Sequence, residues 1–320
     1  MINARVGIVS WNTADLLDAC LESLPAALAG LGAEIVVVDN NSADGSADVA
    51  RRHPGVTVLQ NPENVGYAAA MNQALRGVNG ALTPTALVAL NPDTVLPPES
   101  LTRLVQLLHA DPSTALVVPK LINPDGTTQH SVHRFPSPVV SAVAGMVPVR
   151  WQDGRLADRW WLEVGANHDR PSDIEWAIGA VHVIRPDAVD ADHPYSERWF
   201  MYVEDLDLCW RLDQAGWRRR LEPSVAVVHV GNASGSQAWG GGRTRRWLVA
   251  NYDWYRLCHG EAATRLWAAA NAAGVLARIG GGAVRRIARR PVEPWRRDLA
   301  KVLPLHLRVL ALGVPEPSGS

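Results

Sequence analysis

Residues 34–46 read EIVVVDNNSADGS, where a short β-branched apolar run passes directly into a polar segment. The run Ile35–Val38 lacks the polar alternation of a half-exposed strand, so it predicts a strand buried on both faces. The polar residues from Asp39 to Ser46 are typical of a loop that leads into the next helix. A strand of this kind is characteristic of a parallel sheet covered by helices.

The same alternation extends on both sides of this segment. Continuous apolar strands separated by helices predict an α/β fold with a mostly parallel sheet. We expect Asn12-Thr13 to cap the first helix, whose apolar residues follow a 3.6-residue period. The predicted strands are Val6–Val9, Ile35–Val38, Val56–Leu59, Leu87–Leu90 and Leu116–Val118, and the later helices are Ala68–Leu75 and Pro98–His109.

The second half of the chain is less regular. Residues 123–173 have no clear period, and strand-like patterns return at Trp176–Ile184 and Val225–Val230. After residue 242 the composition predicts two helices, Trp247–Cys258 and Ala262–Arg289. We expect the glycine triplet at 280–282 to break the second of these helices.

The composition is that of a globular protein. The chain has 320 residues, 47% hydrophobic and 20% charged, which excludes a disordered, collagen-like or coiled-coil chain. Its three cysteines, Cys20, Cys209 and Cys258, are far apart and predict free thiols in a reducing compartment. We recognise no signal peptide at the start, and no apolar run reaches the roughly 18 residues that span a bilayer.

The net charge of −1 hides an asymmetry. Residues 243–320 contain 14 basic and 5 acidic residues, a formal charge of +9, and the remainder carries −10. Such a tail favours contact with an anionic surface, either nucleic acid or anionic lipid, although a solvated basic helix face gives the same pattern. Arg278, Arg285 and Arg289 lie at spacings that place them near one helical face.

Polar clusters follow four of the predicted strands: residues 10–12, 39–46, 61–67 and 91–93. Each cluster alone could be a turn, but parallel strands bring their carboxyl ends to one edge of the sheet, where nucleotides bind. A dinucleotide site is disfavoured because the glycine-rich fingerprint is missing after the first strand, and no P-loop motif occurs.

A second cluster combines carboxylates with aromatic residues. Residues 200–211 read FMYVEDLDLCWR, which places Glu204, Asp205 and Asp207 within four positions. Acidic residues in a first helical turn can simply complement the helix dipole. A carboxylate among aromatic residues is partly desolvated, which raises its pKa and suits it to proton abstraction. His229, at the end of a later strand, is either a core histidine or a metal ligand.

These motifs resemble those of family 2 glycosyltransferases with the GT-A fold, in particular a rhamnosyltransferase-like subgroup. The resemblance covers about Val6 to Ser234 and matches the family in order and spacing. It rests on VSWN (9–12), VVVDNNSADGS (36–46), NPENVGYAAAMNQAL (61–75), LNPDT (90–94), WAIGAVHVIRPDA (176–188), FMYVEDLDLCWRLDQAGW (200–217) and HVGNAS (229–234).

The resemblance implies a role for individual residues. Asp205 matches the catalytic base, with Glu204 beside it, and Asp93 and His229 match ligands of Mg²⁺ or Mn²⁺. Asn91 stands where the family often has the first Asp of its D-x-D motif. The segments that line the nucleotide contribute Ser10, Asn12, Asp39, Asn64, Gly66, Asn72, Asn91 and Asp93, and the acceptor side contributes Trp176, Gly179, Ala180 and Trp210.

The implied activity is inverting, metal-dependent transfer of a single sugar from a nucleoside-diphosphate sugar to an acceptor hydroxyl. The alternatives are another nucleotide-binding transferase, such as a nucleotidyltransferase, and a non-catalytic carbohydrate-binding module. A processive polysaccharide synthase is disfavoured, because the chain lacks both spanning segments and a Q-x-x-R-W motif. The resemblance favours dTDP-rhamnose as donor, then UDP-hexoses and then GDP-sugars.

The resemblance also implies the partners, and together with the shift in composition after residue 242 it predicts the domain layout. The acceptor is expected to be a glycan, a lipid-linked glycan or a small molecule, with no nucleic acid as partner. We expect a catalytic domain at 1–242, with a nucleotide-binding half at about 1–120 and an acceptor-binding half at about 121–242. Residues 243–320 form a basic, mainly helical extension. The expected location is cytoplasmic, with peripheral contact to the anionic inner face of the membrane.

Overall fold

A computed structural model describes residues 3–77, 83–146, 168–231, 243–287 and 295–315. Its contacts divide the chain into two compact units. The first comprises residues 1–133 and 168–240, and the second comprises residues 134–167 and 241–320. The predicted domain boundary at residue 242 stays a prediction. The structure adds that residues 134–146 group with the C-terminal helices.

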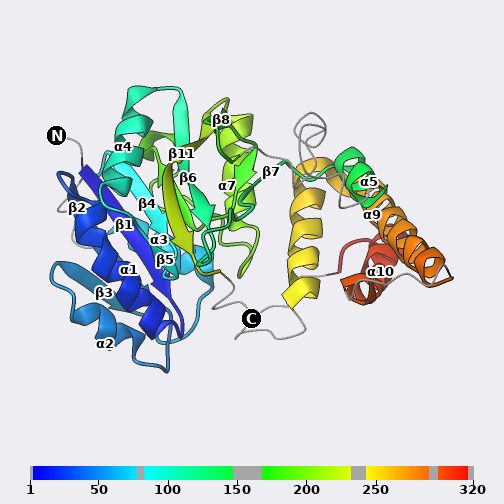
Figure 1. Ribbon diagram of the computed structural model, residues 1–320, viewed down its shortest axis with the longest axis horizontal. Helices are drawn as coiled ribbons and strands as arrows, with labels where there is room; N and C mark the ends of the chain where they lie inside the picture. Colours follow the sequence, from blue (N-terminus) through cyan, green and yellow to red (C-terminus); the bar gives the residue numbers. More distant parts are fainter. Residues whose placement is uncertain (1–2, 78–82, 147–167, 232–242, 288–294, 316–320) are drawn as a thin grey trace. The chain divides into compact units, whose positions relative to one another are not determined.

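The first unit is built on one central sheet (Figure 1). Within the described residues its strands follow the order β3-β2-β1-β4-β10-β6-β11-β5, with β8 paired to β11. Strands β3, β2, β1 and β4 are parallel, whereas β10 is antiparallel to both β4 and β6. The strands are β1 Asn3–Ser10, β2 Gly32–Asp39, β3 Val56–Gln60, β4 Ala86–Leu90, β5 Thr94–Val95, β6 Thr114–Ile122, β8 Ser172–Asp173, β10 Val181–Ile184 and β11 Arg218–His229.

Helices cover both faces of this sheet, as the apolar strands predict. Val6 and Ile8 of β1 belong to the hydrophobic cluster formed with α1 and α4. Gly7, between them, faces α3, where an added Cβ would lie 2.9 Å from the Cβ of Ala74. The helices of this unit are α1 Ala14–Ala27, α2 Ser46–Arg51, α3 Tyr67–Arg76, α4 Ser100–Ala110 and α7 Glu204–Gln214, with the 3₁₀ turn η2 at Pro186–Ala188.

The expected α/β fold with a mostly parallel sheet is therefore confirmed. The strand-like pattern from Trp176 to Ile184 resolves into two strands, β9 (Trp176–Ala177) and β10. Strand β9 pairs with β7 (Val132–His133) in a small separate sheet. All three cysteines are free thiols, as expected.

The predicted cap of the first helix is wrong in detail. Thr13 occupies the N-cap position of α1 but makes no capping hydrogen bond. Its hydroxyl pairs instead with the Ser10 hydroxyl at 2.9 Å. Asp44, from the loop after β2, accepts the Ala14 N–H at 2.8 Å. A carboxylate from the neighbouring loop therefore satisfies this helix N-terminus.

The second unit consists of helices α5 (Pro138–Met146), α9 (Arg243–Ile287) and α10 (Trp295–Leu312). Helix α9 packs against both α5 and α10. The predicted break at the glycine triplet 280–282 is wrong, because helix α9 continues through it to Ile287. The non-helical residue is Gly260, with φ 81°. Packing against neighbouring helices overrides the low helix propensity of glycine.

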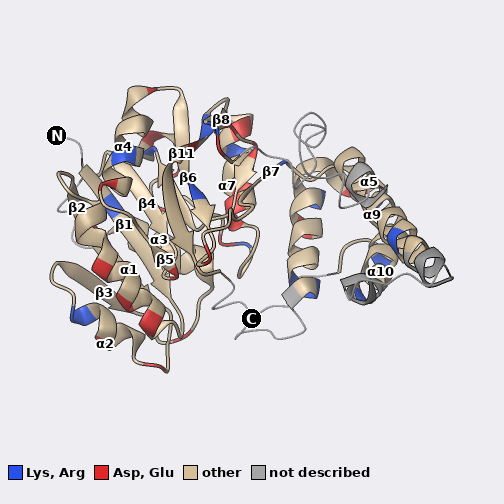
Figure 2. Cartoon of the chain, viewed as in Figure 1, with Lys and Arg blue, Asp and Glu red and all other residues tan. Residues whose placement is uncertain are grey.

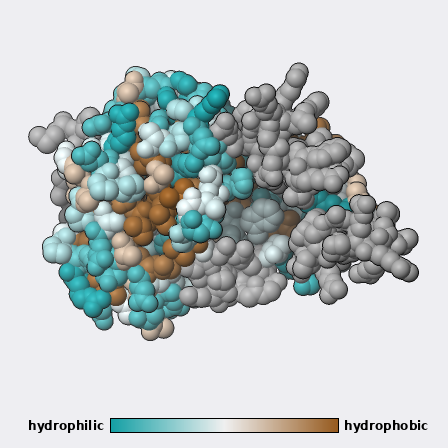
Figure 3. Space-filling view, viewed as in Figure 1, coloured by the Kyte–Doolittle hydropathy of each residue, from teal (hydrophilic) through white to brown (hydrophobic). Residues whose placement is uncertain are grey.

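The second unit also differs from the first in charge and surface. The coloured residues on α9 and α10 are mostly basic, whereas acidic residues are spread over the first unit (Figure 2). On the face shown in Figure 3, hydrophobic atoms of the first unit gather near its centre and hydrophilic atoms surround them. No described helix is long and apolar enough to cross a membrane. The side chain of Arg285 and all of Arg289, predicted to share a face with Arg278, lie outside the described residues.

Candidate functional site

The polar clusters predicted at the strand ends lie along one edge of the sheet. Strands β3, β2, β1 and β4 are parallel neighbours, so the residues that follow them emerge side by side. Backbone hydrogen bonds connect the first loops directly. The Asn40 N–H donates to the Ser10 carbonyl at 2.8 Å, and the Asn61 N–H donates to the Asp39 carbonyl at 2.9 Å. This edge is where open α/β sheets bind ligands.

Asp39 is the buried acidic residue of this edge. It is 1% exposed, and its Oδ2 accepts the Ser42 N–H at 3.3 Å. Its Oδ1 is buried and finds no hydrogen-bond partner among the described residues. A buried carboxylate oxygen without a donor is costly unless a ligand supplies one. The geometry therefore fits a donor group of a bound ligand, such as a base N–H.

Ser10 and Asn12 lie at the end of β1 and in the loop after it, and hydrogen bonds of Asn12 connect this loop with the loop after β2. Asn12 adopts a left-handed conformation with φ 53°, and its side-chain oxygen accepts the Ala43 N–H at 2.8 Å. The Asn12 N–H donates to the Ser42 hydroxyl at 3.0 Å. Ser10 is fully buried beside Thr13. These contacts fix the loop at the edge where a nucleotide is expected to lie.

A buried asparagine, Asn40, holds the third loop. Its Nδ2 donates to Asn64 Oδ1 at 2.8 Å, and its Oδ1 accepts the Asn61 amide at 3.0 Å. Gly66, at the start of α3, has φ 86°, and a Cβ there would lie 2.6 Å from the carbonyl oxygen of Phe200. Asn64 and Gly66 therefore shape the loop that brings α3 against the segment before Glu204.

Asn72 makes its hydrogen bonds with the segment around Tyr195. It is fully buried in α3, where its Nδ2 donates to the Tyr195 carbonyl at 2.8 Å and to Glu197 Oε1 at 2.9 Å. Its Oδ1 accepts the Tyr195 N–H at 3.0 Å. These bonds fasten α3 to the 195–197 segment. The prediction that Asn72 lines the nucleotide stays a prediction.

Asn91 and Asp93 follow β4 at the centre of the edge. The Asn91 N–H donates to the Ala180 carbonyl at 2.9 Å, which ties this loop to the start of β10. The Asp93 carbonyl accepts the Val230 N–H at 2.9 Å. His229, at the end of β11, is therefore brought beside Asp93. Its Nε2 lies 3.3 Å from Asp93 Oδ1, and both side chains are at least nine-tenths buried.

A chain of hydrogen bonds sets the tautomer of His229. Hydrogen bonds from Thr127 lower the pKa of Asp125, which is ionised at neutral pH and accepts the Thr127 hydroxyl at 2.6 Å. The Thr127 oxygen must then accept from Asn123 Nδ2 at 2.9 Å, which leaves Asn123 Oδ1 to accept from Gln129 Nε2 at 3.2 Å. Gln129 Oε1 therefore faces His229 Nδ1, at 2.7 Å, and that nitrogen carries the proton.

This tautomer decides what can lie between His229 and Asp93. In the neutral imidazole the Nε2 lone pair points at a carboxylate oxygen, so a proton or a cation must separate the two acceptors. The carboxylate is the kind of ligand that Mn²⁺ and Mg²⁺ prefer, and an imidazole held by a hydrogen bond on its other nitrogen can add a nitrogen ligand. The described residues contain no group of three or more His, Cys, Asp or Glu that could hold a metal. A metal here would thus depend on substrate oxygens and water for its remaining ligands.

The predicted base, Asp205, belongs to a second group of acidic side chains, in the first turn of α7. Asp205 Oδ2 accepts the Gly179 N–H at 3.0 Å, and its Oδ1 accepts the Leu206 N–H at 2.7 Å. Burial raises the pKa of Asp205 above that of an ordinary carboxyl. Burial also raises the pKa of Glu204, and the neighbouring charge of Asp205 raises it further. Near neutral pH Asp205 can therefore take up a proton, whereas Glu204 holds its proton more tightly.

Tyr67 connects this pair to the metal-side residues. Burial raises its pKa well above the ordinary value, and the charges of Glu204, Asp205 and Asp93 add to this effect. Its hydroxyl donates to the Gly179 carbonyl at 3.4 Å. Tyr202, two residues before Glu204, has φ 93°, a strained conformation of the kind that gathers at functional sites. The charges of all three carboxylates therefore act on the same buried phenol.

Of the four residues predicted for the acceptor side, two make the contacts with the site that are given above. Gly179 and Ala180 lie next to Asp205 and Asn91 through the contacts given above. The ring of Trp176, in β9, packs on His133 with 4.6 Å between ring centroids. Trp210 lies half-buried on α7. Asn232, Ala233 and Ser234, which belong to the HVGNAS motif, lie outside the described residues.

Three residues of the site are not singled out by the sequence. Asn40 and Tyr67 stand inside the family motifs, but nothing in their spacing distinguishes them from their neighbours. Gln129 lies in the irregular middle of the chain, where neither period nor motif points to it. Its role follows only from the strand pairing that brings His229 beside it.

Comparison with known proteins places this site in a family. The model of the family described as "Glycosyl transferase family 2" matches residues 5–164. An N-acetylglucosaminyl-diphospho-decaprenol L-rhamnosyltransferase of Mycobacterium tuberculosis (strain ATCC 25618 / H37Rv) is 28% identical over 204 residues, 61% of this chain and 66% of that protein. A succinoglycan biosynthesis protein of Rhizobium meliloti (strain 1021) is 26% identical over 236 residues, 72% of this chain and 64% of that protein. The match thus spans just under two thirds of these relatives.

A solved structure extends the likeness to the whole fold. A mannosyltransferase from Pyrobaculum calidifontis, in complex with GDP-Man and Mn²⁺, aligns with 97% of this chain and 87% of its own, at a TM-score of 0.59 and 19% identity. The fold is therefore GT-A, as the sequence motifs imply. With the family model matching half of the chain, we conclude that this protein belongs to glycosyl transferase family 2.

Proposed function

We propose that this chain transfers a single sugar from a nucleoside-diphosphate sugar to a hydroxyl group of a glycan, a lipid-linked glycan or a small molecule. One observation carries the proposal. A buried carboxylate, Asp205, is fixed by the Gly179 N–H, and its charge, like that of Asp93, reaches the same buried tyrosine. Direct glycosyl transfer requires a base for the acceptor hydroxyl and a group that can hold the cation of the diphosphate, and Asp205 and Asp93 are suited to these two roles.

In the proposed reaction Asp205 is the base and Glu204 is its neutral neighbour. Asp205 accepts the proton of the acceptor hydroxyl as that oxygen forms its bond to the anomeric carbon. The bond from the anomeric carbon to the diphosphate oxygen breaks, and the nucleoside diphosphate leaves. Because the hydroxyl displaces the diphosphate directly, the anomeric configuration inverts. Glu204, beside Asp205, holds its own proton more tightly and keeps a second negative charge away from the base.

The donor is held at the strand ends. Asp39 offers its unpartnered Oδ1 to a donor group of the nucleotide base. Asp93 and His229 are the residues that would hold Mg²⁺ or Mn²⁺. When bound, such a cation stabilises the negative charge that develops on the diphosphate leaving group. The Mn²⁺ in the mannosyltransferase complex supports a divalent cation in this fold.

The identity of the donor and acceptor rests on the relatives. The mycobacterial relatives are named as L-rhamnosyltransferases that act on a diphospho-decaprenol. This supports dTDP-rhamnose as donor before UDP-hexoses, and a lipid-linked acceptor. A lipid-linked acceptor agrees with the basic, apolar surface of the second unit, for which we propose peripheral contact with an anionic membrane.

Release of nucleoside diphosphate tests the proposal. Each sugar nucleotide is incubated with Mn²⁺, with and without a polyprenyl-diphosphate glycan acceptor. We expect acceptor-dependent release of nucleoside diphosphate from one donor. A nucleotidyltransferase that acts on the same sugar nucleotide would release the sugar 1-phosphate instead, and a binding module would release neither product. Either of these two results contradicts the proposal.

A further inference from the structure

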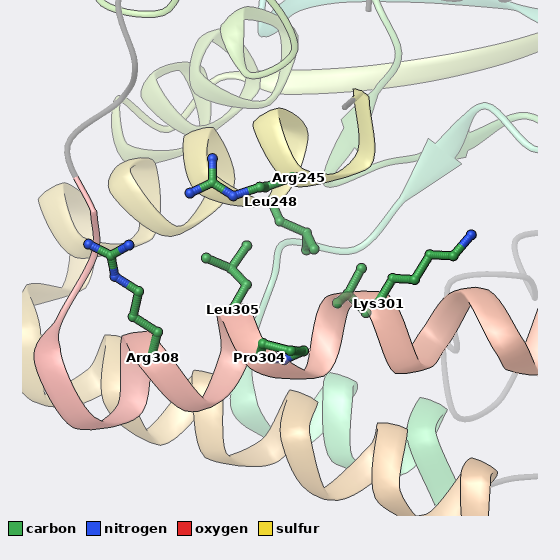
Figure 4. A pocket seen from close by; sticks show the side chains of 7 residues that line it. Arg245, Leu248, Lys301, Pro304, Leu305 and Arg308 are labelled. Atoms are coloured by element: carbon green, nitrogen blue, oxygen red, sulfur yellow. The ribbon is translucent and has the colours of Figure 1, made fainter. Parts of the chain in front are cut away.

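The second unit contains a pocket of about 240 Å³ between the first turns of α9 and the middle of α10. Three cationic side chains line it: Arg245 from α9, and Lys301 and Arg308 from α10. In Figure 4 the guanidinium groups of Arg245 and Arg308 reach toward the same end of the pocket, and Lys301 extends toward the other end. No acidic residue is among the described residues that line it.

Apolar side chains form the rest of the lining. They are Leu248, Pro304 and Leu305, which lie between the cationic side chains in Figure 4, and Val302. Leu305 is 7% exposed, whereas the three cationic residues are exposed. The pocket therefore has an apolar interior and a cationic rim. This arrangement is complementary to a molecule with an anionic head and an apolar chain.

The surface around the pocket distinguishes a lipid from a soluble anion. Of the ten large hydrophobic side chains that are exposed among the described residues, eight belong to the second unit. One of them, Leu312, is 78% exposed and lies one helical turn beyond Arg308 on the same face of α10. An apolar chain that leaves the pocket along this face would meet hydrophobic surface rather than water. Inorganic phosphate would gain nothing from it.

We propose that this pocket binds a single lipid phosphate, with its phosphate group at the Arg245 and Arg308 end and its apolar chain against Leu248 and Leu305. Arginine suits this role because its planar guanidinium donates two parallel hydrogen bonds to a phosphate. The site goes beyond the transfer reaction, and none of its residues belongs to the first unit. It would let the chain recognise one lipid headgroup in addition to the overall negative charge of a membrane.

The experiment uses the full chain and isothermal titration calorimetry. Dihexanoyl phosphatidate, kept below its critical micelle concentration, is the probe, and dihexanoyl phosphatidylcholine and inorganic phosphate are the two comparison ligands. We expect saturable binding of one phosphatidate per chain, little binding of phosphatidylcholine, and much weaker binding of inorganic phosphate. Equal affinity for inorganic phosphate and phosphatidate would overturn the lipid assignment.

Matched variants separate the pocket from general charge. Arg245→Ala with Arg308→Ala removes two exposed cations, each of which contributes about fivefold in affinity, so binding should weaken more than tenfold. Arg265→Ala is the control, because Arg265 lies on α9 outside the pocket, where it pairs with Glu261. It should leave the affinity unchanged. An unaltered affinity in the double variant, or an equal loss in Arg265→Ala, would overturn the proposal.

Failure of this site and failure of the proposed transfer reaction are distinguishable. The titration needs neither donor nor metal, so it reports on the pocket alone. Since all three arginines are exposed in the structure, melting temperatures close to that of the wild type are expected for the variants. A variant with both arginines replaced by lysine, Arg245→Lys with Arg308→Lys, keeps the two positive charges but loses the paired hydrogen bonds. Its affinity should therefore lie between that of the double alanine variant and that of the wild type. Binding as tight as that of the wild type would contradict the guanidinium geometry that the proposal requires.

Discussion

His229 Nε2 lies 3.3 Å from Asp93 Oδ1, and the Nδ1 of the same ring lies 2.7 Å from Gln129 Oε1. The ring is thus held between an amide oxygen and a carboxylate. The hydrogen bonds that run from Asp125 to Gln129 place a proton on Nδ1, so in the neutral imidazole the lone pair of Nε2 faces Asp93. This polarity would suit the pair to the cation that we propose for it, and Gln129 would then act on the site through the imidazole ring alone.

Gln129→Leu should therefore weaken Mn²⁺ binding by about 10- to 100-fold, the usual effect of removing a second-shell partner. The measurement is a Mn²⁺ titration followed by electron paramagnetic resonance on the protein without donor. Gln129→Glu keeps an acceptor at the same position and should retain most of the affinity. The ¹⁵N chemical shifts of His229 should show a protonated Nδ1 in the wild type and a tautomer mixture in Gln129→Leu. The same tautomer in both proteins would contradict the role of Gln129.

Asp205→Asn should lower kcat by about 10²- to 10⁴-fold, the typical effect of losing a general base. The Asn side chain can still accept the Gly179 N–H, so donor binding, measured by calorimetry, should stay within about twofold. Asp207→Asn is the control, because Asp207 pairs with Arg211 at 2.8 Å on the same helix. It should change kcat much less. A wild-type kcat in Asp205→Asn would move the base to Glu204 or Asp207.

The raised pKa of Asp205 predicts how activity depends on pH. The base must be ionised, so kcat/KM should fall as pH decreases through the pKa of Asp205 in the folded protein. Because burial raises this pKa, the fall should occur well above pH 4, where an ordinary carboxyl titrates. The pH–rate profile measures the midpoint. A profile that is flat down to pH 4 would exclude a buried carboxylate as the base.

The raised pKa of Asp205 also predicts the sign of a stability change. A carboxyl whose pKa is higher in the folded than in the unfolded state stabilises the fold at low pH, and this contribution is lost as pH rises through the folded-state pKa. At neutral pH the ionised Asp205 thus destabilises the fold. Asp205→Asn should raise the free energy of unfolding there, by about 1.4 kcal/mol for every tenfold difference in proton affinity between the folded and unfolded states. Urea unfolding at pH 7.5 and at pH 4 measures this, and the gain should disappear at pH 4.

The sequence predicts the parallel half of the sheet well, because buried parallel strands have an unmistakable apolar composition. Val6–Val9 and Ile35–Val38 lie inside β1 and β2. It does not predict the direction of β10, since a strand buried on both faces has the same pattern in either orientation. Helix α5, in the irregular middle, and the unbroken glycine triplet of α9 depend on packing between helices that lie far apart in sequence.

The residues of the candidate site, like the elements of the fold, are only partly predicted by the sequence. Asp93, Glu204, Asp205 and His229 stand in motifs, and the structure brings Asp93 beside His229 and Asp205 beside Gly179. Tyr67 and Gln129 carry no signal of their own, because their importance comes from what surrounds them. The sequence likewise does not predict that Asp39 Oδ1 lacks a hydrogen-bond donor among the described residues, since this depends on how the surrounding loops fold.

The two glycines of the site should respond in opposite ways to a methyl group. At Gly66 a Cβ would lie 2.6 Å from the carbonyl oxygen of Phe200, and φ is 86°, so Gly66→Ala must displace backbone. We expect a loss of stability of about 1–3 kcal/mol, measured by urea unfolding. At Gly179 a Cβ would lie 3.5 Å from the Cβ of Asp205, an ordinary contact, so Gly179→Ala should unfold like the wild type.

The function of Gly179→Ala should nevertheless change. The added methyl group would stand beside the carboxylate of Asp205 and the hydroxyl of Tyr67, where we propose that the acceptor gives up its proton. We therefore expect a higher KM for the acceptor, an unchanged KM for the donor and at most a modest fall in kcat. Steady-state kinetics with each substrate varied in turn separate these quantities. A raised donor KM with an unaltered acceptor KM would place Gly179 on the nucleotide side and remove it from the acceptor site.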